Sequence, residues 1–349
     1  MKAQILVLFT LFFSFFGCSK PEVNENESFT EISKNVAFKL DNQTFYLKSG
    51  KFNYEFRKSE LPLKKVVLLN ASLVGYFTAL NQESKIAGIS SPEYIFSPKI
   101  RELISQNIIA EVGNEQKYNV EKIISLKPDA VFTNYIATFA NTYQLLEQNG
   151  IKVIFLDEYL EQNPLEKSRY LIVFGKLLGA EKLAETRYRE IEQNYRLYAA
   201  AAKAKDPKPL VLANEMYGNQ WYLPGGRSAL SQFVKDAGGN YILAEDKGAQ
   251  AKLMSFEEVF VKGQKAEIWV NVGNHKSKKQ LLQANPNYRK LPVFNNGKLY
   301  ALTAKESGKA NDFFESGTVR ADLVLKDYIA IFHPAIFPEH TLTYLQVLK

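Results

Sequence analysis

The segment Asn119-Val-Glu-Lys-Ile-Ile-Ser-Leu-Lys-Pro-Asp-Ala-Val-Phe132 is the most informative part of this chain, because a similar unit recurs in the second half. The second copy reads Ser255-Phe-Glu-Glu-Val-Phe260 and is followed by the apolar run Lys265-Ala-Glu-Ile-Trp-Val270. Each copy opens with a helix-capping residue, places a glutamate (Glu121 or Glu257) two positions later, and runs through one short helix into a strand. One copy in each half predicts two similar α/β lobes with a cleft between them.

The rest of the chain supports this arrangement. Short predicted strands alternate with helices in both halves, which indicates doubly wound lobes with central, largely parallel sheets. Residues 36–57 instead alternate aromatic and polar positions between plausible turns, so they predict a β-meander at the edge of the first lobe. Residues 181–203 carry apolar side chains at helical spacing and contain neither Gly nor Pro. We therefore expect a helix roughly 34 Å long that joins the lobes as a rigid spine.

These patterns divide the chain into five expected segments. A chain of 349 residues is too long for one compact core and suits two domains. The expected segments are a lipoprotein signal peptide at 1–17, a flexible tether at 18–35, an N-terminal α/β lobe at 36–160, a helical linker at 161–205 and a C-terminal α/β lobe at 206–349.

The N-terminus has the pattern of an export signal. Lys2 precedes the apolar run Ile5–Phe16, which is too short to cross a bilayer core of roughly 30 Å. The run leads to Gly17-Cys18, and Cys18 is the only cysteine of the chain. This resembles a bacterial lipobox, in which the cysteine is lipidated, although Phe15 and Phe16 depart from the usual leucine and small residue. A plain signal peptide with an incidental cysteine is the alternative. We expect a periplasmic protein anchored through Cys18 to the inner or the outer membrane.

The charge of the chain does not suggest a nucleic-acid partner. There are 44 Lys and Arg residues against 37 Asp and Glu residues, which gives a formal net charge of +7. The basic residues are scattered and are not interleaved with aromatic residues in runs, so they indicate a solvated basic surface.

Residues for catalysis or for binding a bare metal ion are scarce. The three histidines, His275, His333 and His340, all lie in the second half, so a zinc or manganese site built from imidazoles of both lobes is not expected. The chain lacks a Gly-x-Ser-x-Gly elbow, a phosphate-binding Gly-x4-Gly-Lys-Ser/Thr loop and a Gly-x-Gly-x-x-Gly motif. We therefore expect no enzyme, no catalytic residue, no metal site and no resident cofactor.

The motifs, taken in order, resemble those of class III substrate-binding proteins. These are the helical-backbone receptors of ABC importers for vitamin B12, ferric siderophores and haem, and the likeness is to a lipoprotein branch common in Bacteroidetes. It covers about residues 60 to 345. Beyond the doubled unit, the motifs that carry it are Ser91-Pro-Glu-Tyr-Ile95, Glu158-Tyr-Leu-Glu161, Trp221-Tyr-Leu-Pro-Gly-Gly226, Asp236-Ala-Gly-Gly-Asn240, Asn311-Asp-Phe-Phe-Glu-Ser-Gly317, Arg320-Ala-Asp-Leu-Val-Leu-Lys-Asp327, Ile331-Phe-His-Pro334 and Phe337-Pro-Glu-His340.

The resemblance implies a role for the doubled glutamate. In such receptors, one glutamate on each lobe pairs with arginines of the permease dimer, and by motif position these are Glu121 and Glu257. The simpler interpretation is structural, because a glutamate in the first turn of a helix stabilises it by roughly 0.3–1 kcal/mol without any further role.

Candidate ligand contacts follow from the expected sheets, because ligands of open α/β sheets meet the loops at the carboxyl ends of strands. The aromatic candidates suit the broad face of a macrocycle or a catecholate, although burial in the core is an equally good interpretation of each one. Glu93 and Arg320 could meet charged groups. The candidates are Asn70, Glu93, Tyr94, Tyr135, Tyr217, Trp221, Tyr222, Asn274, Asn311, Phe313 and Arg320.

The sequence and the resemblance together predict a monomeric lipid-anchored receptor. It would capture an iron or cobalt chelate between its lobes, an iron–siderophore in the first place, and deliver it to an ABC permease. Cobalamin and haem are the alternative ligands. A surface lipoprotein enzyme that processes a chelate is the alternative from another class, and the absence of a nucleophile–base pair argues against it.

Overall fold

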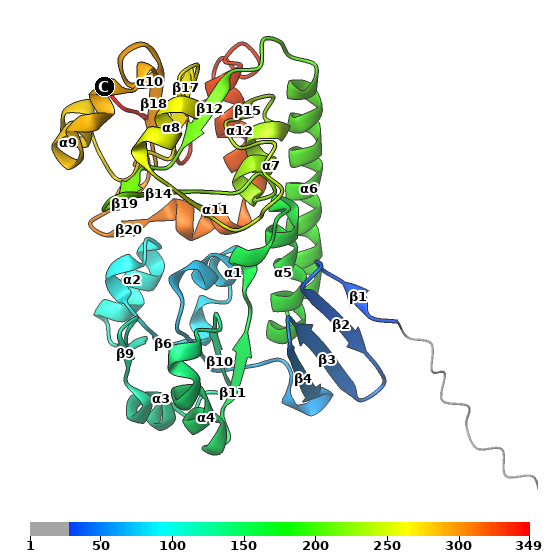
Figure 1. The fold of residues 1–349 in the computed structure, drawn as a ribbon. Coiled ribbons are helices and arrows are strands. Elements are labelled where there is room, and N and C mark those ends of the chain that lie inside the picture. Colours follow the sequence, from blue (N-terminus) through cyan, green and yellow to red (C-terminus); the bar gives the residue numbers. More distant parts are fainter. Residues whose placement is uncertain (1–27) are drawn as a thin grey trace, which may run out of the picture.

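Two α/β lobes lie one above the other in the structure, a computed structural model that describes residues 28–349 (Figure 1). This confirms the predicted fold class. The expected signal peptide and the anchor residue Cys18 lie outside the described residues. Within residues 28–349, no helix combines the length and the apolar character needed to cross a membrane.

The sheet of the first lobe is entirely parallel. Its strand order is β11-β10-β5-β6-β7, and the strands are β5 (Val66–Leu68), β6 (Ile86–Ile89), β7 (Ala110–Glu111), β10 (Ala130–Thr133) and β11 (Lys152–Phe155). Along β5, Val66 and Leu68 belong to one apolar cluster and Val67 belongs to another, because successive side chains point to opposite faces of the sheet. Both faces are therefore buried, as expected for a parallel sheet. The helices of this lobe are α1 (Val74–Ala79), α2 (Pro98–Ser105), α3 (Val120–Leu126) and α4 (Ala140–Gln148).

The second lobe repeats this plan with a different strand order. Its sheet runs β15-β12-β17-β18-β21, and only the last neighbour is antiparallel. The strands are β12 (Leu210–Ala213), β15 (Asn240–Tyr241), β17 (Ile268–Val270), β18 (Lys298–Ala301) and β21 (Gln346–Val347). A separate antiparallel sheet holds β13 (Met216–Tyr217), β14 (Gln220–Leu223) and β16 (Lys252–Met254). The helices are α7 (Ala229–Asp236), α8 (Phe256–Lys262), α9 (Lys278–Ala284) and α10 (Pro292–Asn296).

Two helices form the connection between the lobes. Asn163 caps α5 (Pro164–Leu178), and Gly179 ends it in the left-handed conformation with a φ of 70°. The chain then turns back into α6 (Glu181–Lys203), which has the predicted bounds and runs alongside both lobes (Figure 1). A hairpin of two packed helices resists bending more than a single helix would, so the lobes are held on a stiff support.

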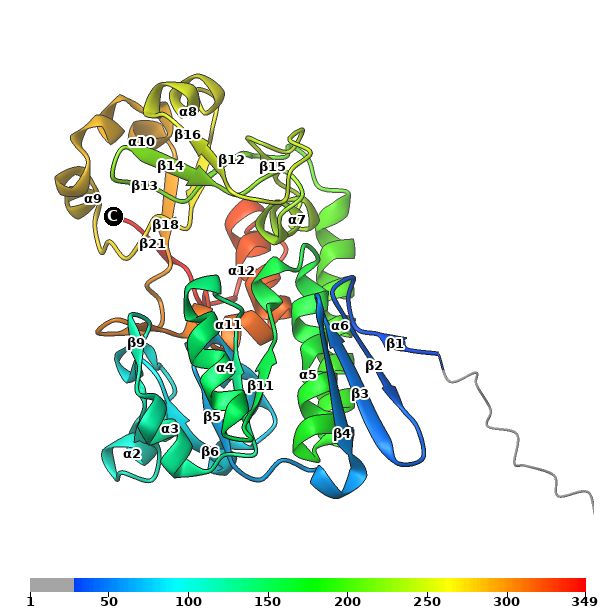
Figure 2. The same cartoon turned by 60° about the horizontal axis from the view of Figure 1, so that its bottom comes forward.

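The predicted β-meander is present and is larger than expected. It consists of β1 (Thr30–Glu31), β2 (Val36–Leu40), β3 (Thr44–Ser49) and β4 (Phe52–Arg57), and it packs beside α5 and the first lobe (Figure 2). Thr30 pairs with Phe38, and the side chain of Ile32 is buried. The folded part therefore begins before residue 36, because burial of Ile32 fixes a segment that the polar sequence had suggested to be a tether.

The last helical segment of the chain is broken in two. It forms α11 (Ser316–Val319) and α12 (Ala321–Phe332). Arg320 lies between them with a ψ of 62°, outside the helical range. Its guanidinium donates to both carboxylate oxygens of the buried Asp322 at 2.8 Å each. This bidentate pair holds the corner and lets α11 lie across the first lobe.

Candidate binding site

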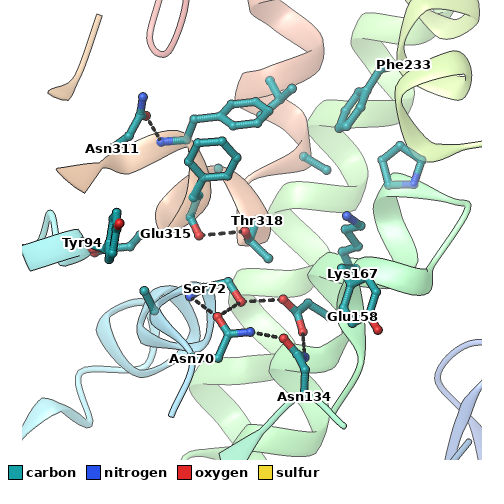
Figure 3. A pocket seen from close by; sticks show the side chains of 18 of the residues that line it. Asn70, Ser72, Tyr94, Asn134, Glu158, Lys167, Phe233, Asn311, Glu315 and Thr318 are labelled. Carbon is teal, nitrogen blue, oxygen red and sulfur yellow. Dashed lines mark hydrogen bonds between the residues drawn. The ribbon is translucent and has the colours of Figure 1, made fainter. Parts of the chain in front are cut away.

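A cavity of about 470 Å³ lies between the two lobes (Figure 3). Its size falls within the range of roughly 300–1,000 Å³ that is usual for small-molecule sites. The first lobe and α5 contribute mainly polar groups, and the second lobe contributes mainly aromatic and aliphatic groups. The polar side includes Asn70, Ser72, Asn134, Glu158 and Lys167, and the apolar side includes Phe233, Phe313, Phe314, Ala321 and Val324.

The polar wall lies where the strand order of the first sheet reverses. From β5 the chain proceeds to β6 and β7 on one side, and then crosses to β10 and β11 on the other. Asn70 follows β5, and Asn134 follows β10, so both sit at the carboxyl ends of the two strands that flank this point. Ligands of open α/β sheets bind at this place, because the connections diverge there and leave a crevice.

A network of side-chain hydrogen bonds fixes this wall. The amide of Asn70 donates to the side-chain oxygen of Asn134, and the amide of Asn134 donates to Leu156 O at 2.6 Å and to Glu158 Oε2 at 3.0 Å. Ser72 Oγ lies 2.9 Å from Asn70 Oδ1 and 2.6 Å from Glu158 Oε1. The network holds its side chains in one arrangement before any ligand binds.

The protonation of Glu158 follows from this network. A hydroxyl has one hydrogen, so Ser72 can donate to Asn70 or to Glu158 but not to both at once. Burial raises the pKa of Glu158, while the bonds from Ser72 and Asn134 lower it. A protonated Glu158 would donate to Ser72 Oγ and free that hydroxyl to donate to Asn70.

Glu315 connects the two lobes at the edge of the cavity. It belongs to the chain segment of the second lobe, yet its carboxylate accepts hydrogen bonds from the backbone N–H groups of Phe96 and Ser97 at the start of α2. Burial raises its pKa to about 7, although both backbone bonds lower it. A β-carbon on Gly75 of α1 would lie 2.3 Å from the carbonyl oxygen of Glu315, so only glycine permits this approach.

The apolar wall exposes aromatic surface to the cavity. The rings of Phe313 and Phe314 meet edge to face at 5.3 Å, and Phe314 keeps 54% of its surface exposed. Opposite them, the ring of Tyr94 lies 5.6 Å from the ammonium of Lys309, which comes from the other lobe. An amphipathic ligand would therefore place its apolar face on the second lobe and its polar groups on the first.

The structure brings four of the sequence candidates together at the cavity. Asn70, Tyr94, Asn311 and Phe313 all line it. Asn311 is buried, its amide donates to Leu302 O, and its side-chain oxygen accepts from the Phe313 N–H at 2.9 Å. Asn311 therefore shapes the wall, and Phe313 presents the surface.

Two aromatic candidates are turned away from the cavity. Trp221 is completely buried, packs against Trp269 and Tyr288, and donates from Nε1 to Ala213 O at 3.1 Å. The expected ligand contact of Trp221 is therefore corrected to a core position. Tyr135 faces a second, aromatic cavity beside the meander, where it contacts Phe52 and Phe155.

The remaining candidates do not line the cavity either. Tyr217 is 83% exposed at the tip of the β13–β14 hairpin, and Tyr222, Asn274 and Glu93 are also exposed outside the cavity. Arg320 lies next to cavity residues but its guanidinium is held by Asp322. Residue type and position in the chain do not reveal which way a side chain turns once distant segments pack together.

Several cavity residues were missed by the sequence reasoning. Asn134 and Glu158 stand just after β10 and β11, so the rule that nominated Tyr135 could also have found them. Lys167 and Phe233 are on helices, and no local pattern marks them. The missed residues include Ser72, Glu115, Asn134, Glu158, Tyr159, Lys167, Phe233, Lys309, Glu315 and Thr318.

Both copies of the doubled unit form capped helices with an exposed glutamate. Asn119 caps α3 and Ser255 caps α8, and Glu121 and Glu257 occupy the second helical position in each case. In the second copy the reciprocal cap is made by Glu258, whose carboxylate accepts from the Ser255 N–H at 2.7 Å. Capping therefore does not require Glu257, whose carboxylate accepts no hydrogen bond among the described residues.

The second-lobe histidines have structural partners. His340 Nε2 lies 2.7 Å from the buried Asp327, and His333 Nε2 lies 3.1 Å from Gly238 O. His275 Nε2 lies 2.7 Å from Glu215 Oε2. Within residues 28–349, no group of three or more His, Cys, Asp or Glu side chains is arranged to hold a metal ion.

Comparison with known proteins assigns this two-lobed chain to a family. Residues 66–306 match the sequence profile described as periplasmic binding protein. The chain belongs to the periplasmic binding protein family. This family consists of binding proteins and not of enzymes, which confirms the expectation that the chain is no enzyme, and it locates the protein outside the cytoplasm.

Individual relatives of this periplasmic binding protein are distant. An uncharacterised lipoprotein of Methanocaldococcus jannaschii is 22% identical over 82% of this chain and 69% of its own length. A periplasmic haem-binding protein from Pseudomonas aeruginosa aligns with a TM-score of 0.60 at 19% identity, covering 82% of this chain and 98% of its own. A possible iron-binding, periplasmic solute-binding protein from Staphylococcus epidermidis aligns with a TM-score of 0.59 at 18% identity, covering 78% and 99%. At these identities the solved structures show a shared fold.

Proposed function

We propose that this protein is the solute-binding component of an ABC importer, and that it captures an iron chelate, in the first place an iron–siderophore, between its lobes. The single observation that carries the proposal is the preformed cavity with one polar and one apolar wall. An iron chelate also has a polar and an apolar part, because its donor groups are polar and its organic frame is not. Cobalamin is a less favoured ligand of the same cavity.

Haem is the second candidate ligand, because two phenols line the cavity. Tyr94 and Tyr159 both border it, and Tyr159 is 55% exposed. A tyrosine oxygen is one of the side-chain groups that hold haem iron in proteins. The distant haem-binding structure from Pseudomonas aeruginosa is in keeping with this alternative.

Delivery to a permease is the second half of the proposal. Glu121 and Glu257 are exposed on different lobes at equivalent helix positions, so they offer two separated anionic contacts to a cationic partner. Such contacts favour orientation and rapid encounter more than affinity. Lipidation of Cys18, a monomeric state and membership of the lipoprotein branch common in Bacteroidetes complete the proposal.

Binding of defined ligands to the purified full-length protein tests the capture step. We expect tight binding of at least one of a ferric siderophore panel, haemin or cobalamin, read from absorbance and from quenching of tyrosine and tryptophan fluorescence. A coloured ligand that co-purifies would identify the natural chelate directly. If none of these compounds binds, the proposed function is wrong.

A further inference from the structure

Lys167 places an ammonium group in the cavity without a protein partner. It lies in the first turns of α5, the helix behind the cavity, and Figure 3 shows its side chain rising between Glu158 and Phe233. Its backbone is fixed, because Lys167 O accepts a hydrogen bond from the Tyr76 hydroxyl at 2.8 Å. Among residues 28–349, the ammonium forms no hydrogen bond and has no carboxylate within 4.0 Å.

The environment of this ammonium makes its lack of a partner costly. Desolvation by burial lowers the pKa of Lys167, and the charges of Glu158 and Glu161 raise it. Lys167 is only partly exposed, and a partly desolvated charge without a counter-charge is unfavourable, so such groups are normally paired. A bound anion would supply the missing counter-charge.

The two acids whose charges raise the pKa of Lys167 are already engaged with other groups. The Glu158 carboxylate accepts hydrogen bonds from the side chains of Ser72 and Asn134. Glu161 accepts from Ser33 Oγ at 2.6 Å and from the Tyr170 hydroxyl at 2.7 Å. Neither carboxylate forms an ion pair with Lys167 within 4.0 Å, so the ammonium remains available to the cavity.

Lys309 supplies a second cation to the same cavity. It comes from the β19 (Glu306–Ser307) to β20 (Ala310–Asn311) turn of the second lobe and contacts only the ring of Tyr94 among charged or aromatic partners of the described residues. The remaining lining acids, Glu115 and Glu315, form no ion pair with either lysine among the described residues. Glu115 is exposed, and Glu315 accepts backbone N–H bonds from α2.

We propose that Lys167 selects the charge of the ligand, so that the cavity prefers a chelate with an anionic oxygen group, a carboxylate or a catecholate, over a neutral or cationic chelate of the same size. The ligand lies with its apolar face on Phe313 and Phe314 and directs its anionic group to Lys167, with Lys309 as a second, solvent-exposed contact. This assignment rests on the proposed function, since it concerns the same cavity.

Matched ligand pairs test the assignment on the full-length protein. One pair is haemin, with two free propionates, and its dimethyl ester, in which both are neutral. The other pair is a ferric tris-catecholate, which is anionic, and a ferric trihydroxamate of the ferrioxamine type, which is cationic. We expect the anionic member of the pair that binds to bind roughly 10- to 100-fold more tightly, as a charged hydrogen bond in a buried site implies.

Variants of two lysines on the same helix separate charge selection from folding. Lys167→Met should abolish most of the preference while keeping or raising thermal stability, because it replaces an unpaired, partly desolvated charge with an unbranched apolar side chain of nearly the same length. Lys167→Arg should retain the preference. Lys176→Met is the control, since Lys176 is half-buried on α5 but does not line the cavity.

The outcomes distinguish this inference from the proposed function. If the wild type binds a chelate but Lys167→Met discriminates charge as strongly as the wild type, the role of Lys167 is refuted and the receptor function stands. A wild-type preference for the ester or the hydroxamate would refute it equally. If no member of the ferric siderophore panel, haemin or cobalamin binds at all, the proposed function itself fails.

Discussion

The Glu315 carboxylate of the second-lobe segment lies 3.1 Å from the backbone nitrogen of Ser97, at the first turn of α2 in the other lobe. The same carboxylate accepts from the Phe96 N–H and is almost completely buried. A single side chain therefore joins the lobes just before a helix that has no acidic residue of its own in the first turn, and forms part of the cavity wall. The cavity wall and the contact between the lobes therefore share this residue.

Glu315 makes stability depend on pH. Its pKa is raised by burial from 4.5 to about 7, so the folded state binds the proton more tightly than the unfolded chain does. The folded state is therefore favoured below pH 4.5 and loses this contribution, on the order of 3 kcal/mol, as pH rises to about 7. We expect the stability of the wild type relative to Glu315→Gln to fall over this interval in urea denaturation. A difference that does not change with pH would contradict the assignment.

Gly75 should be essential for the contact between α1 and Glu315. A β-carbon there would meet backbone atoms, which cannot move aside as a flexible side chain would. We expect Gly75→Ala to lower the midpoint of thermal unfolding and to weaken ligand binding, with a loss of stability of roughly 1–3 kcal/mol. Gly317→Ala is the matched control on the opposing helix, because its β-carbon would have no neighbour closer than 3.5 Å. Equal behaviour of the two variants would argue against a tight lobe contact.

The paired glutamates should act in transport and not in binding. We expect Glu121→Arg combined with Glu257→Arg to abolish cellular uptake of the ligand, because like charges would then face a cationic permease surface, while the dissociation constant of the purified protein is unchanged. Two controls are available. Glu185→Arg reverses an exposed charge on α6, and Glu258→Gln weakens the α8 cap beside Glu257. Both controls should retain uptake. If the double variant also retains uptake, the docking prediction is wrong and the two glutamates only stabilise their helices.

Variants of Trp221 and Phe313 should affect different properties, the first the stability of the fold and the second the affinity for the ligand. Trp221→Phe leaves a void in a fully buried cluster and an unpaired Ala213 carbonyl, so we expect it to lose roughly 1–3 kcal/mol of stability with little change in ligand affinity. Phe313→Ala removes ring surface from the cavity and should weaken ligand binding about tenfold or more. Chemical denaturation and ligand titration of both variants check this. The reverse result would restore Trp221 as a ligand contact.

The sequence predicted the helical spine and the capped helices correctly because their signals are local. The bounds of α6 follow from apolar spacing between breaks at Gly179 and Asp206-Pro207, and Ser255 caps α8 through atoms three residues away. The interruption at Arg320 could not be anticipated in this way. It depends on the buried pair with Asp322, which forms only where α12 packs against α6.

The same distinction between local and tertiary causes applies to the candidate site. Periodicity and the order of strands were sufficient to predict two α/β lobes, their parallel sheets and a site at the carboxyl ends of the strands, since each depends on neighbours in the chain. The identity of the cavity walls depends on packing between distant segments. Trp221 and Phe313 look alike in the sequence as aromatic residues in or just after a strand, yet packing buries Trp221 completely and leaves Phe313 partly exposed at the cavity. Lys167 and Phe233 reach the cavity because α5 and α7 are packed there. The Lys167 ammonium has no ion-pair partner among the described residues because of this packing, which no local sequence pattern marks.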